Sequence, residues 1–316
     1  MTKLKVLISD GLGEDGIALL RRAAGVDVQP KITPDELLTV LPQYHGLIVR
    51  SRTKVTTKVI EAGTSLKVIG RAGVGVDNID VAAAVACGVA IVNSPLAATV
   101  SVAELTLALI LAMAREIPRA DAAMKKGEWL KSGLTGVELY GKTLGLVAVG
   151  RIGAAVAGRA GAFGMRVIAC DPFLSPEDIR QRQAHPTTLD ELLSISDYIS
   201  IHTPLTPQTK NLIGADAFAK MKDGARIICA ARGGVVDEEA LLAALNSGKV
   251  AGAALDVFAT EPPGITPLVS HPKVIGTPHI GAQTVEAQNR ASVDIAEEVL
   301  AVLEDREPRW RVSSNL

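Results

Sequence analysis

The chain has 316 residues, a formal charge of −1, 48% hydrophobic residues and 21% charged residues. The length favours two domains, and the composition excludes a disordered chain. Without a basic surplus the chain lacks the electrostatic footprint of a nucleic-acid binder.

Membrane and disulfide classes are excluded on similar grounds. The longest apolar run, residues 105–114, is far shorter than the roughly 20 residues that a bilayer-spanning helix needs. Cys87, Cys170 and Cys229 are too few and too scattered for a disulfide framework or a metal cluster, and their apolar neighbours predict that each is a core residue. We therefore expect a soluble, cytoplasmic protein without a metal site.

Short aliphatic runs alternate with helical patterns along the whole chain. Residues 237–246 and 285–304 have helical patterns, and the predicted strands are residues 5–9, 47–50, 67–70, 89–93, 144–150, 166–171, 197–202, 226–230, 251–256 and 274–276. This alternation predicts an α/β fold of parallel sheets covered by helices on both faces.

The best domain boundary is residues 93–100, which lead into an apolar helix over 101–115. A second soft region, residues 125–141, precedes a new strand, turn and helix. The chain thus forms one α/β unit up to about residue 95 and then a second. The last helix could pack on either one.

Residues 144–164 indicate a dinucleotide-binding loop. Ala148-Val-Gly150-Arg151-Ile152-Gly153 has the layout of the G-x-G-x-x-G fingerprint, with Ala148 in place of the first glycine. Gly150 would allow a pyrophosphate to approach the backbone, Gly153 would allow the helix to pack on the strand, and Arg151 adds a cation. The methyl group of Ala148 is expected to shift the turn or weaken binding.

The next strand ends at Asp171, 18 residues after Gly153, where an acid should hold the ribose 2′-hydroxyl. No arginine follows before Arg180, so a 2′-phosphate has no evident host and NAD is favoured over NADP. The alternative is an ordinary βαβ unit in which Asp171-Pro172 is only a turn.

Three residues that follow the carboxyl ends of successive strands suit hydride transfer from a 2-hydroxy acid. His279 can take the hydroxyl proton, Glu261 can fix the imidazole tautomer, and Arg232 can hold the substrate carboxylate. The alternatives are a surface charge for Arg232, a turn for Glu261-Pro-Pro, and a helix cap for His279. His202 is expected to bond to backbone, and His45, His185 and His271 to be exposed in polar turns.

With these residues the sequence resembles the D-isomer-specific 2-hydroxyacid dehydrogenase family. The matching segments are residues 71–78, 141–153, 202–207, 231–237, 254–258, 261–263 and 277–281. The resemblance implies that Arg232, Glu261 and His279 are catalytic. With Gly150 and Gly153, the expected NAD contacts are Val74, Arg151, Ile152, Asp171, Thr203, Pro204, Ala230, Ala231, Asp256, Gly281 and Ala282.

The resemblance also implies a domain division. It assigns residues 1–97 and 285–316 to a discontinuous, flavodoxin-like substrate domain and residues 98–284 to a Rossmann NAD-binding domain. A hinge near residues 95–100 and 283–287 and a homodimer follow from the same resemblance.

Within the family the chain is most similar to the D-3-phosphoglycerate dehydrogenases, which catalyse the entry step to serine. Arg50, Ser51 and Arg52 supply two cations and a hydroxyl for a substrate phosphate, although a strand-end charge cluster is the alternative. The further expected substrate contacts are Gly73, Val74, Gly75 and Lys131, the last reaching across a dimer in some members.

Some features leave other interpretations open. Ala98 and Cys229 stand where the family often has Asn. The changed loop at Ala98 motivates a glyoxylate or hydroxypyruvate reductase as a second hypothesis. An NAD-sensing, corepressor-like binding protein is a third, although added tails and basic arms are lacking. Because the chain stops soon after its last helix, we do not expect a regulatory domain.

Overall fold

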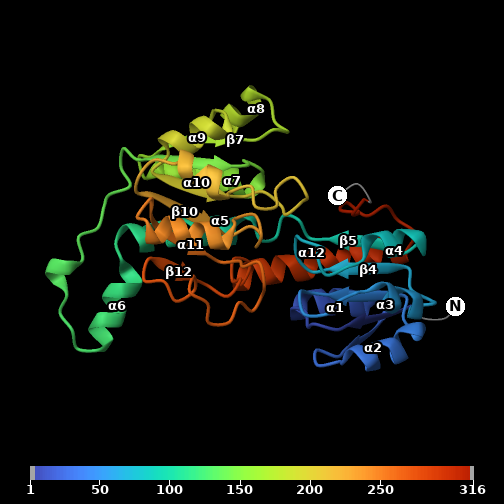
Figure 1. Cartoon of the computed structure of the whole chain (residues 1–316). Helices are drawn as coiled ribbons and strands as arrows, with labels where there is room; N and C mark the ends of the chain where they lie inside the picture. Colours follow the sequence, from blue (N-terminus) through green and yellow to red (C-terminus); the bar gives the residue numbers. More distant parts are fainter. Residues whose placement is uncertain (1–3, 314–316) are drawn as a thin grey trace. The chain divides into compact units, whose positions relative to one another are not determined.

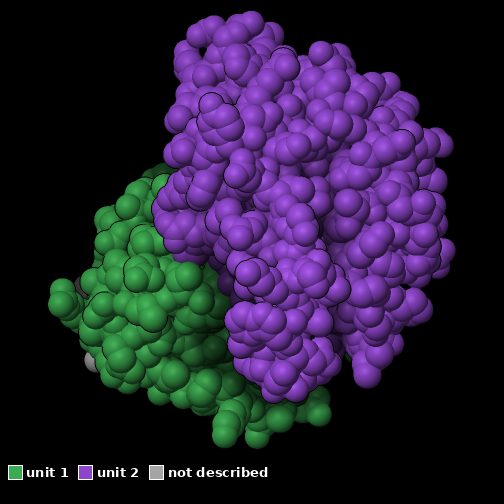
Figure 2. Space-filling model, turned by 90° about the vertical axis from the view of Figure 1, so that its left-hand side faces the viewer, with its two compact units in different colours: residues 1–98, 282–316 green, residues 99–281 purple. Residues whose placement is uncertain are grey.

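The computed structural model describes residues 4–313, and the chain divides into two compact units. Unit 1 comprises residues 1–98 and 282–316, and unit 2 comprises residues 99–281 (Figures 1 and 2). The chain therefore leaves unit 1, forms all of unit 2, and returns for its last helix.

Unit 1 is built around a parallel five-stranded sheet with the order β2-β1-β3-β4-β5. This is the order of flavodoxin-like sheets. Its elements are β1 (Lys5–Ile8), α1 (Glu14–Ala23), β2 (Gly25–Val28), α2 (Pro34–Val40), η1 (Leu41–Gln43), β3 (Gly46–Val49), α3 (Thr57–Ala62), β4 (Val68–Arg71), α4 (Val81–Ala86), β5 (Ala90–Asn93) and α12 (Val285–Leu303).

Alternating strand side chains give the unit 1 sheet two apolar faces. One packs against α2, α3 and α4, and the other packs against α1 and α12. Glycine allows the second layer to lie close: a Cβ on Gly70 would come within 2.6 Å of Val299, and one on Gly16 within 2.4 Å of the Ser292 carbonyl. The final helix is thus part of unit 1, a question that the pattern left open.

Unit 2 is built around a parallel seven-stranded sheet with the order β12-β11-β10-β9-β6-β7-β8. Its elements are α5 (Thr99–Ala114), α6 (Ile117–Lys125), η2 (Lys131–Gly133), β6 (Thr143–Val147), α7 (Arg151–Ala162), β7 (Arg166–Cys170), α8 (Pro176–Gln181), β8 (His185–Pro186), α9 (Leu189–Ile195), β9 (Tyr198–Ile201), α10 (Ala215–Lys220), β10 (Ala225–Cys229), α11 (Glu238–Asn246), β11 (Val250–Leu255) and β12 (Val274–Gly276).

Two apolar layers cover the unit 2 sheet. Helices α9, α10 and α11 pack on one face, and α5, α7 and α8 on the other. The strand order reverses between β6 and β9, and such a switch point opens a crevice at the carboxyl ends of the strands. The fingerprint turn comes directly after β6, so the fold puts it at that crevice.

The predicted fold class, two α/β units with parallel sheets, is confirmed. All ten predicted strands form, but the prediction missed β2 and β8, which are edge strands. Edge strands pair on one side only and carry a weak apolar pattern, here Gly25–Val28 and the two residues of β8. The strand predicted over 144–150 ends at Val147, because the following residues make the turn.

Two other expectations were wrong. Cys87 is exposed at the end of α4, so it is not a core residue, whereas Cys229 is buried. His45 and His271 are half-buried, and only His185 of the three turn histidines is exposed. Among residues 4–313, no helix combines the length and the apolar character that crossing a membrane requires.

Candidate active site

His279 and Glu261 form the best-defined pair in unit 2. His279 Nδ1 lies 2.8 Å from Glu261 Oε2, and the other carboxylate oxygen, Oε1, accepts the Phe258 N–H at 3.1 Å. Both side chains are partly exposed. The backbone thus fixes the carboxylate, and the carboxylate fixes one imidazole nitrogen, which leaves Nε2 as the nitrogen that can face a ligand. Thr284, not His279, caps α12.

Arg232 lies on a loop that packs against the loop carrying Glu261. A Cβ on Gly233 would come within 1.9 Å of the Phe258 carbonyl oxygen, so this contact requires glycine. Arg232 Nη1 donates to the Ala231 carbonyl at 2.7 Å. The three residues predicted to carry the chemistry therefore lie on neighbouring loops at the carboxyl ends of β10, β11 and β12.

Asp256 holds the backbone of the His279 turn. Its side chain is buried, Oδ1 accepts the Thr277 hydroxyl at 2.6 Å and the Ile280 N–H at 2.8 Å, and Oδ2 accepts the Gly281 N–H at 2.8 Å. His279 itself has φ 53°, a left-handed conformation that costs about 1–2 kcal/mol for an L residue. The carboxylate therefore holds the turn in a conformation that the residue would not adopt by preference.

The fingerprint turn has an alanine in place of its first glycine. Ala148 adopts φ 68°, the left-handed conformation that glycine would take more readily. A Cβ on Gly150 would meet nothing within 4 Å, so the backbone is open to a phosphate. A Cβ on Gly153 would come within 2.8 Å of the Ala148 carbonyl, so glycine is needed for the close helix packing. Together with the α7 N-terminus, these features fit a pyrophosphate.

Asp171 and Arg182 both bond to the backbone of Val149, the next residue of that turn. Asp171 Oδ2 accepts the Val149 N–H at 3.0 Å and Oδ1 accepts the Phe173 N–H at 3.0 Å. Arg182 Nη1 donates to the Val149 carbonyl at 2.8 Å. Sequence reasoning missed Arg182. The residue lies 33 positions after Val149, and it reaches the fingerprint turn only because α8 ends beside it.

His202 follows β9 beside the same turn. Its Nε2 lies 2.9 Å from the Ser200 hydroxyl, a side-chain partner where a backbone partner was expected. Burial lowers the pKa of His202 to about 4. The ring lies 3.7 Å from where a Cβ on Gly153 would be, so it supports the start of α7 as a neutral group.

The other predicted cofactor residues are divided between the units. In unit 2, Thr203, Ala230 and Gly281 are buried, Ile152 and Ala231 are half-buried, and Arg151 and Pro204 are exposed near the carboxyl ends of their strands; in unit 1 are Val74 and Ala282.

The basic cluster of unit 1 is organised by Asp10. Its carboxylate accepts the N–H groups of Arg50, at 2.7 Å, and Thr53, at 3.0 Å, and forms an ion pair with Arg52 at 3.0 Å. Arg52 also donates to the carbonyls of Ser9 and Ile32. The Arg52 guanidinium is thus already bound to groups of unit 1.

Arg50 has a different environment. Its Nη1 lies 3.3 Å from Gln288 Oε1, and burial lowers the pKa of its guanidinium, an effect that nearby Asp10 opposes. Ser51 is exposed. Gln288, on the first turns of α12, is a polar neighbour that sequence reasoning missed, because 238 residues separate it from Arg50.

Gly73 anchors the second predicted substrate segment. Its φ of 145° favours glycine, because side chains of L residues rarely tolerate that backbone conformation, and the Arg71 guanidinium occupies the space where a Cβ would lie. The Val74 carbonyl accepts Asn93 Nδ2 at 2.6 Å. Gly75 is half-buried in the same loop, whereas Lys131 is exposed in unit 2, on η2.

Comparison with known proteins agrees with this geometry. A family model described as D-isomer specific 2-hydroxyacid dehydrogenase, NAD binding domain, matches residues 107–281. A D-3-phosphoglycerate dehydrogenase of Synechocystis is 49% identical over 302 residues, which are 96% of this chain and 54% of that protein. The chain spans about half the length of the curated relatives it matches.

Solved structures of similar size also match. The TT0316 protein from Thermus thermophilus has a TM-score of 0.91 at 39% identity, and the match covers 98% of this chain and 100% of that one. A glyoxylate reductase from Paecilomyes thermophila has a TM-score of 0.90 at 30% identity, and the match covers 100% of both chains. The chain therefore belongs to the D-isomer specific 2-hydroxyacid dehydrogenases, with NAD as its cofactor.

Proposed function

We propose that this chain interconverts D-3-phosphoglycerate and 3-phosphohydroxypyruvate with NAD, the entry step to serine. The bond between His279 Nδ1 and Glu261 Oε2 is the observation that carries the proposal, because it prepares an imidazole for proton transfer. Support for the substrate comes from the curated D-3-phosphoglycerate dehydrogenases at 46–49% identity.

The proposed catalytic roles follow from which side-chain atoms are not already bonded within the site. With Nδ1–H donating to Glu261, His279 Nε2 accepts the C2 hydroxyl proton as the alcohol is oxidised, and Glu261 stabilises the imidazolium that forms. Bound NAD supplies the hydride acceptor. Arg232 pairs with the substrate carboxylate through its guanidinium.

We assign the substrate phosphate to Arg50 and Ser51. Arg50 is a partly buried cation with an uncharged neighbour, Gln288, whereas Arg52 is already paired with Asp10 and shapes the loop. Gly73 and Gly75 let the backbone of their loop approach the substrate closely. The phosphate contact is worth about 1.5–3 kcal/mol as a charge-assisted hydrogen bond.

A substrate panel tests the proposal. NADH oxidation by the purified chain is followed with 3-phosphohydroxypyruvate, hydroxypyruvate and glyoxylate, each with the native chain and with Arg50→Gln. We expect a strong preference for the phosphorylated acid, and a loss of about tenfold or more in kcat/KM with Arg50→Gln for that acid only. Indifference to the phosphate would refute the assignment.

A glyoxylate or hydroxypyruvate reductase is the second candidate. It is favoured by Ala98, a buried residue without a polar side chain at a position expected near the substrate, and by the similarity to a glyoxylate reductase structure. Preference for the unphosphorylated acids in the same panel would select it. Binding of NADH without turnover of any acid would instead favour the corepressor-like hypothesis.

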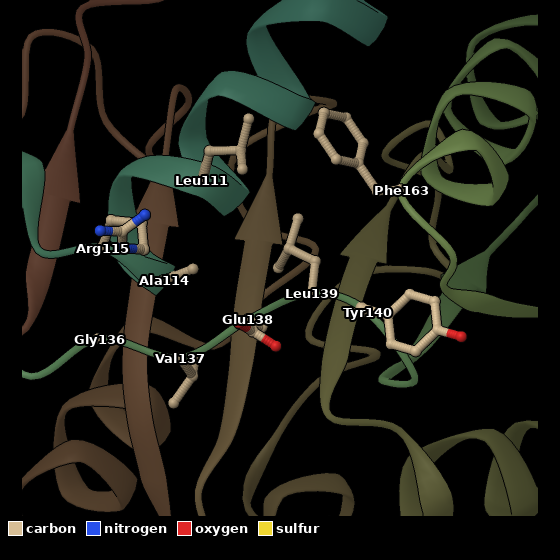
Figure 3. A pocket seen from close by; sticks show the side chains of 9 residues that line it. All are labelled: Leu111, Ala114, Arg115, Gly136, Val137, Glu138, Leu139, Tyr140 and Phe163. Atoms are coloured by element: carbon tan, nitrogen blue, oxygen red, sulfur yellow. The ribbon is translucent and has the colours of Figure 1, made fainter.

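We also propose a cytoplasmic homodimer formed through the arm of unit 2, residues 115–140. The arm, with α6, stands clear of the sheet in Figure 1 and exposes Ile117, Met124, Trp129 and Tyr140. At its base a hollow of about 620 Å³ lies between the end of α5, residues 136–140 and Phe163 (Figure 3). Exposed apolar side chains of this kind are typical of a protein interface.

A second copy would then bring its Lys131 to the substrate. Light scattering tests the dimer directly, and Trp129→Glu is expected to raise the dimer dissociation constant by at least about tenfold. Lys131→Ala is the control, because it should leave the dimer intact while raising KM. A native chain that is monomeric at micromolar concentration would refute this part of the proposal.

A further inference from the structure

Two opposite charges hold the backbone of one residue of the cofactor turn, Val149. The Val149 N–H donates to Asp171, and the Val149 carbonyl accepts from Arg182, with both distances near 3 Å. The two groups therefore bind to the same residue of the turn, and Asp171 is the carboxylate that is expected to hold the ribose 2′-hydroxyl.

The two groups have opposite effects on a phosphate at the ribose 2′ position. A carboxylate accepts the 2′-hydroxyl of NAD and repels the 2′-phosphate of NADP, whereas a nearby arginine accommodates that phosphate. The usual sequence signal for NADP, an arginine close behind the acid, is missing here. The fold instead brings Arg182, from the end of α8, to the cofactor turn.

The position of Arg182 is fixed by its surroundings. The preceding helix, α8, begins with a Ser175 capping box and is anchored by buried Ile179. The arginine follows at the helix end, half-buried, and exposed Asp178 is the acidic group that also interacts with it electrostatically. Gln183 packs against Gly158 of α7, which holds this end of α8 against the helix that follows the cofactor turn.

We propose that Arg182 is a second determinant of cofactor selectivity: it forms a 2′-phosphate subsite that the charge of Asp171 keeps closed. NAD is preferred because the carboxylate excludes the phosphate, and not because a cation is lacking. The proposal deepens the cofactor part of the proposed function and does not depend on the identity of the hydroxy acid.

Binding of NADPH and NADH, followed by cofactor fluorescence without any substrate, tests this inference. Asp171→Ser removes the charge and makes room, so we expect NADPH affinity to rise by about tenfold relative to NADH. In the double variant Asp171→Ser/Arg182→Gln that gain should disappear. Glutamine is the matched replacement, because its amide can still donate to the Val149 carbonyl without carrying a charge.

A gain that survives in the double variant would overturn the role of Arg182, as would an equal loss of NADH and NADPH binding. If Asp171→Ser does not fold, Arg182→Gln in the native chain serves instead: it should weaken the residual NADPH binding by a larger factor than NADH binding. Failure of the substrate panel leaves this measurement unaffected, so the two proposals fail separately.

Discussion

The fingerprint turn and the His279 turn share an unusual backbone conformation for different reasons. Each places an L residue in the left-handed conformation, Ala148 at φ 68° and His279 at φ 53°. At each turn a neighbouring carboxylate accepts backbone N–H groups, Asp171 at the fingerprint turn and Asp256 at the His279 turn. Only the second strained residue has a side chain that the proposed chemistry needs.

The difference shows what each strain contributes. Glycine could replace Ala148 without loss of any side-chain hydrogen bond, because alanine makes none. Glycine could not replace His279 if the imidazole is the proton acceptor. The strain at His279 must therefore be balanced by hydrogen bonds, and buried Asp256 accepts three of them. Mutation can thus distinguish backbone strain at a proposed catalytic residue from backbone strain at a residue without a proposed role.

The largest expected effect comes from His279→Asn. Asn tolerates the left-handed conformation, so the turn should survive while the proton acceptor is lost. We expect kcat to fall by about 10²- to 10⁴-fold, with NADH binding and the thermal midpoint nearly unchanged. Unchanged turnover would show that His279 has no role in the mechanism. The two turns would then no longer differ in whether the strained side chain is needed.

Asp256→Asn should act on the same turn through its backbone. The neutral amide cannot accept all three donors, and a buried donor without a partner costs about 1–3 kcal/mol. We expect both a lower urea midpoint and a reduced kcat. Thr277→Val, which removes only the hydroxyl donor, is the matched control with the smaller effect. A change in kcat without any change in stability would argue against anchoring of the turn.

Gly153→Ala tests the packing side of the fingerprint turn. The new methyl would meet the Ala148 carbonyl at 2.8 Å, so α7 must move, at a cost of about 1–3 kcal/mol. NADH affinity should fall with it, measured by fluorescence titration. Gly161→Ala, in the same helix with nothing within 4 Å, is the control expected to leave binding unchanged.

Protonation of His202 gives a pH-dependent effect in the same region. Its folded pKa of about 4 lies below its ordinary value of 6.5, so the unfolded state gains a proton first. Stability should therefore fall as pH drops from about 6.5 towards 4, with no contribution above that window. In His202→Gln this part of the pH dependence should vanish. Parallel urea-midpoint profiles for the two proteins would contradict it.

Ala148→Gly has the smallest expected effect, and its sign is opposite. Relief of the left-handed strain gains about 1–2 kcal/mol, and the greater freedom of glycine in the unfolded chain offsets about 0.4–1 kcal/mol of it. A net stabilisation of about 0.5–1 kcal/mol should appear as a higher urea midpoint. A destabilised variant would show that the alanine methyl makes contacts that outweigh the strain.

The sequence determined the parts that depend on local pattern. Aliphatic runs predicted ten strands, and the position of each candidate after a strand end predicted that Arg232, Glu261 and His279 would lie on neighbouring loops. This works because parallel strands bring their carboxyl ends to one edge of a sheet, whatever the length of chain between them.

Only the tertiary structure decided which polar groups meet across long stretches of chain. Three such pairs are Asp10 with the Arg50 N–H, Gln288 with the Arg50 guanidinium, and Arg182 with the Val149 carbonyl. Their members are 40, 238 and 33 residues apart along the chain. No periodicity encodes such pairs, because they depend on how helix ends and loops pack. The sequence thus determined the fold class and which residues are candidates for the chemistry, and packing decided how each of these residues is held.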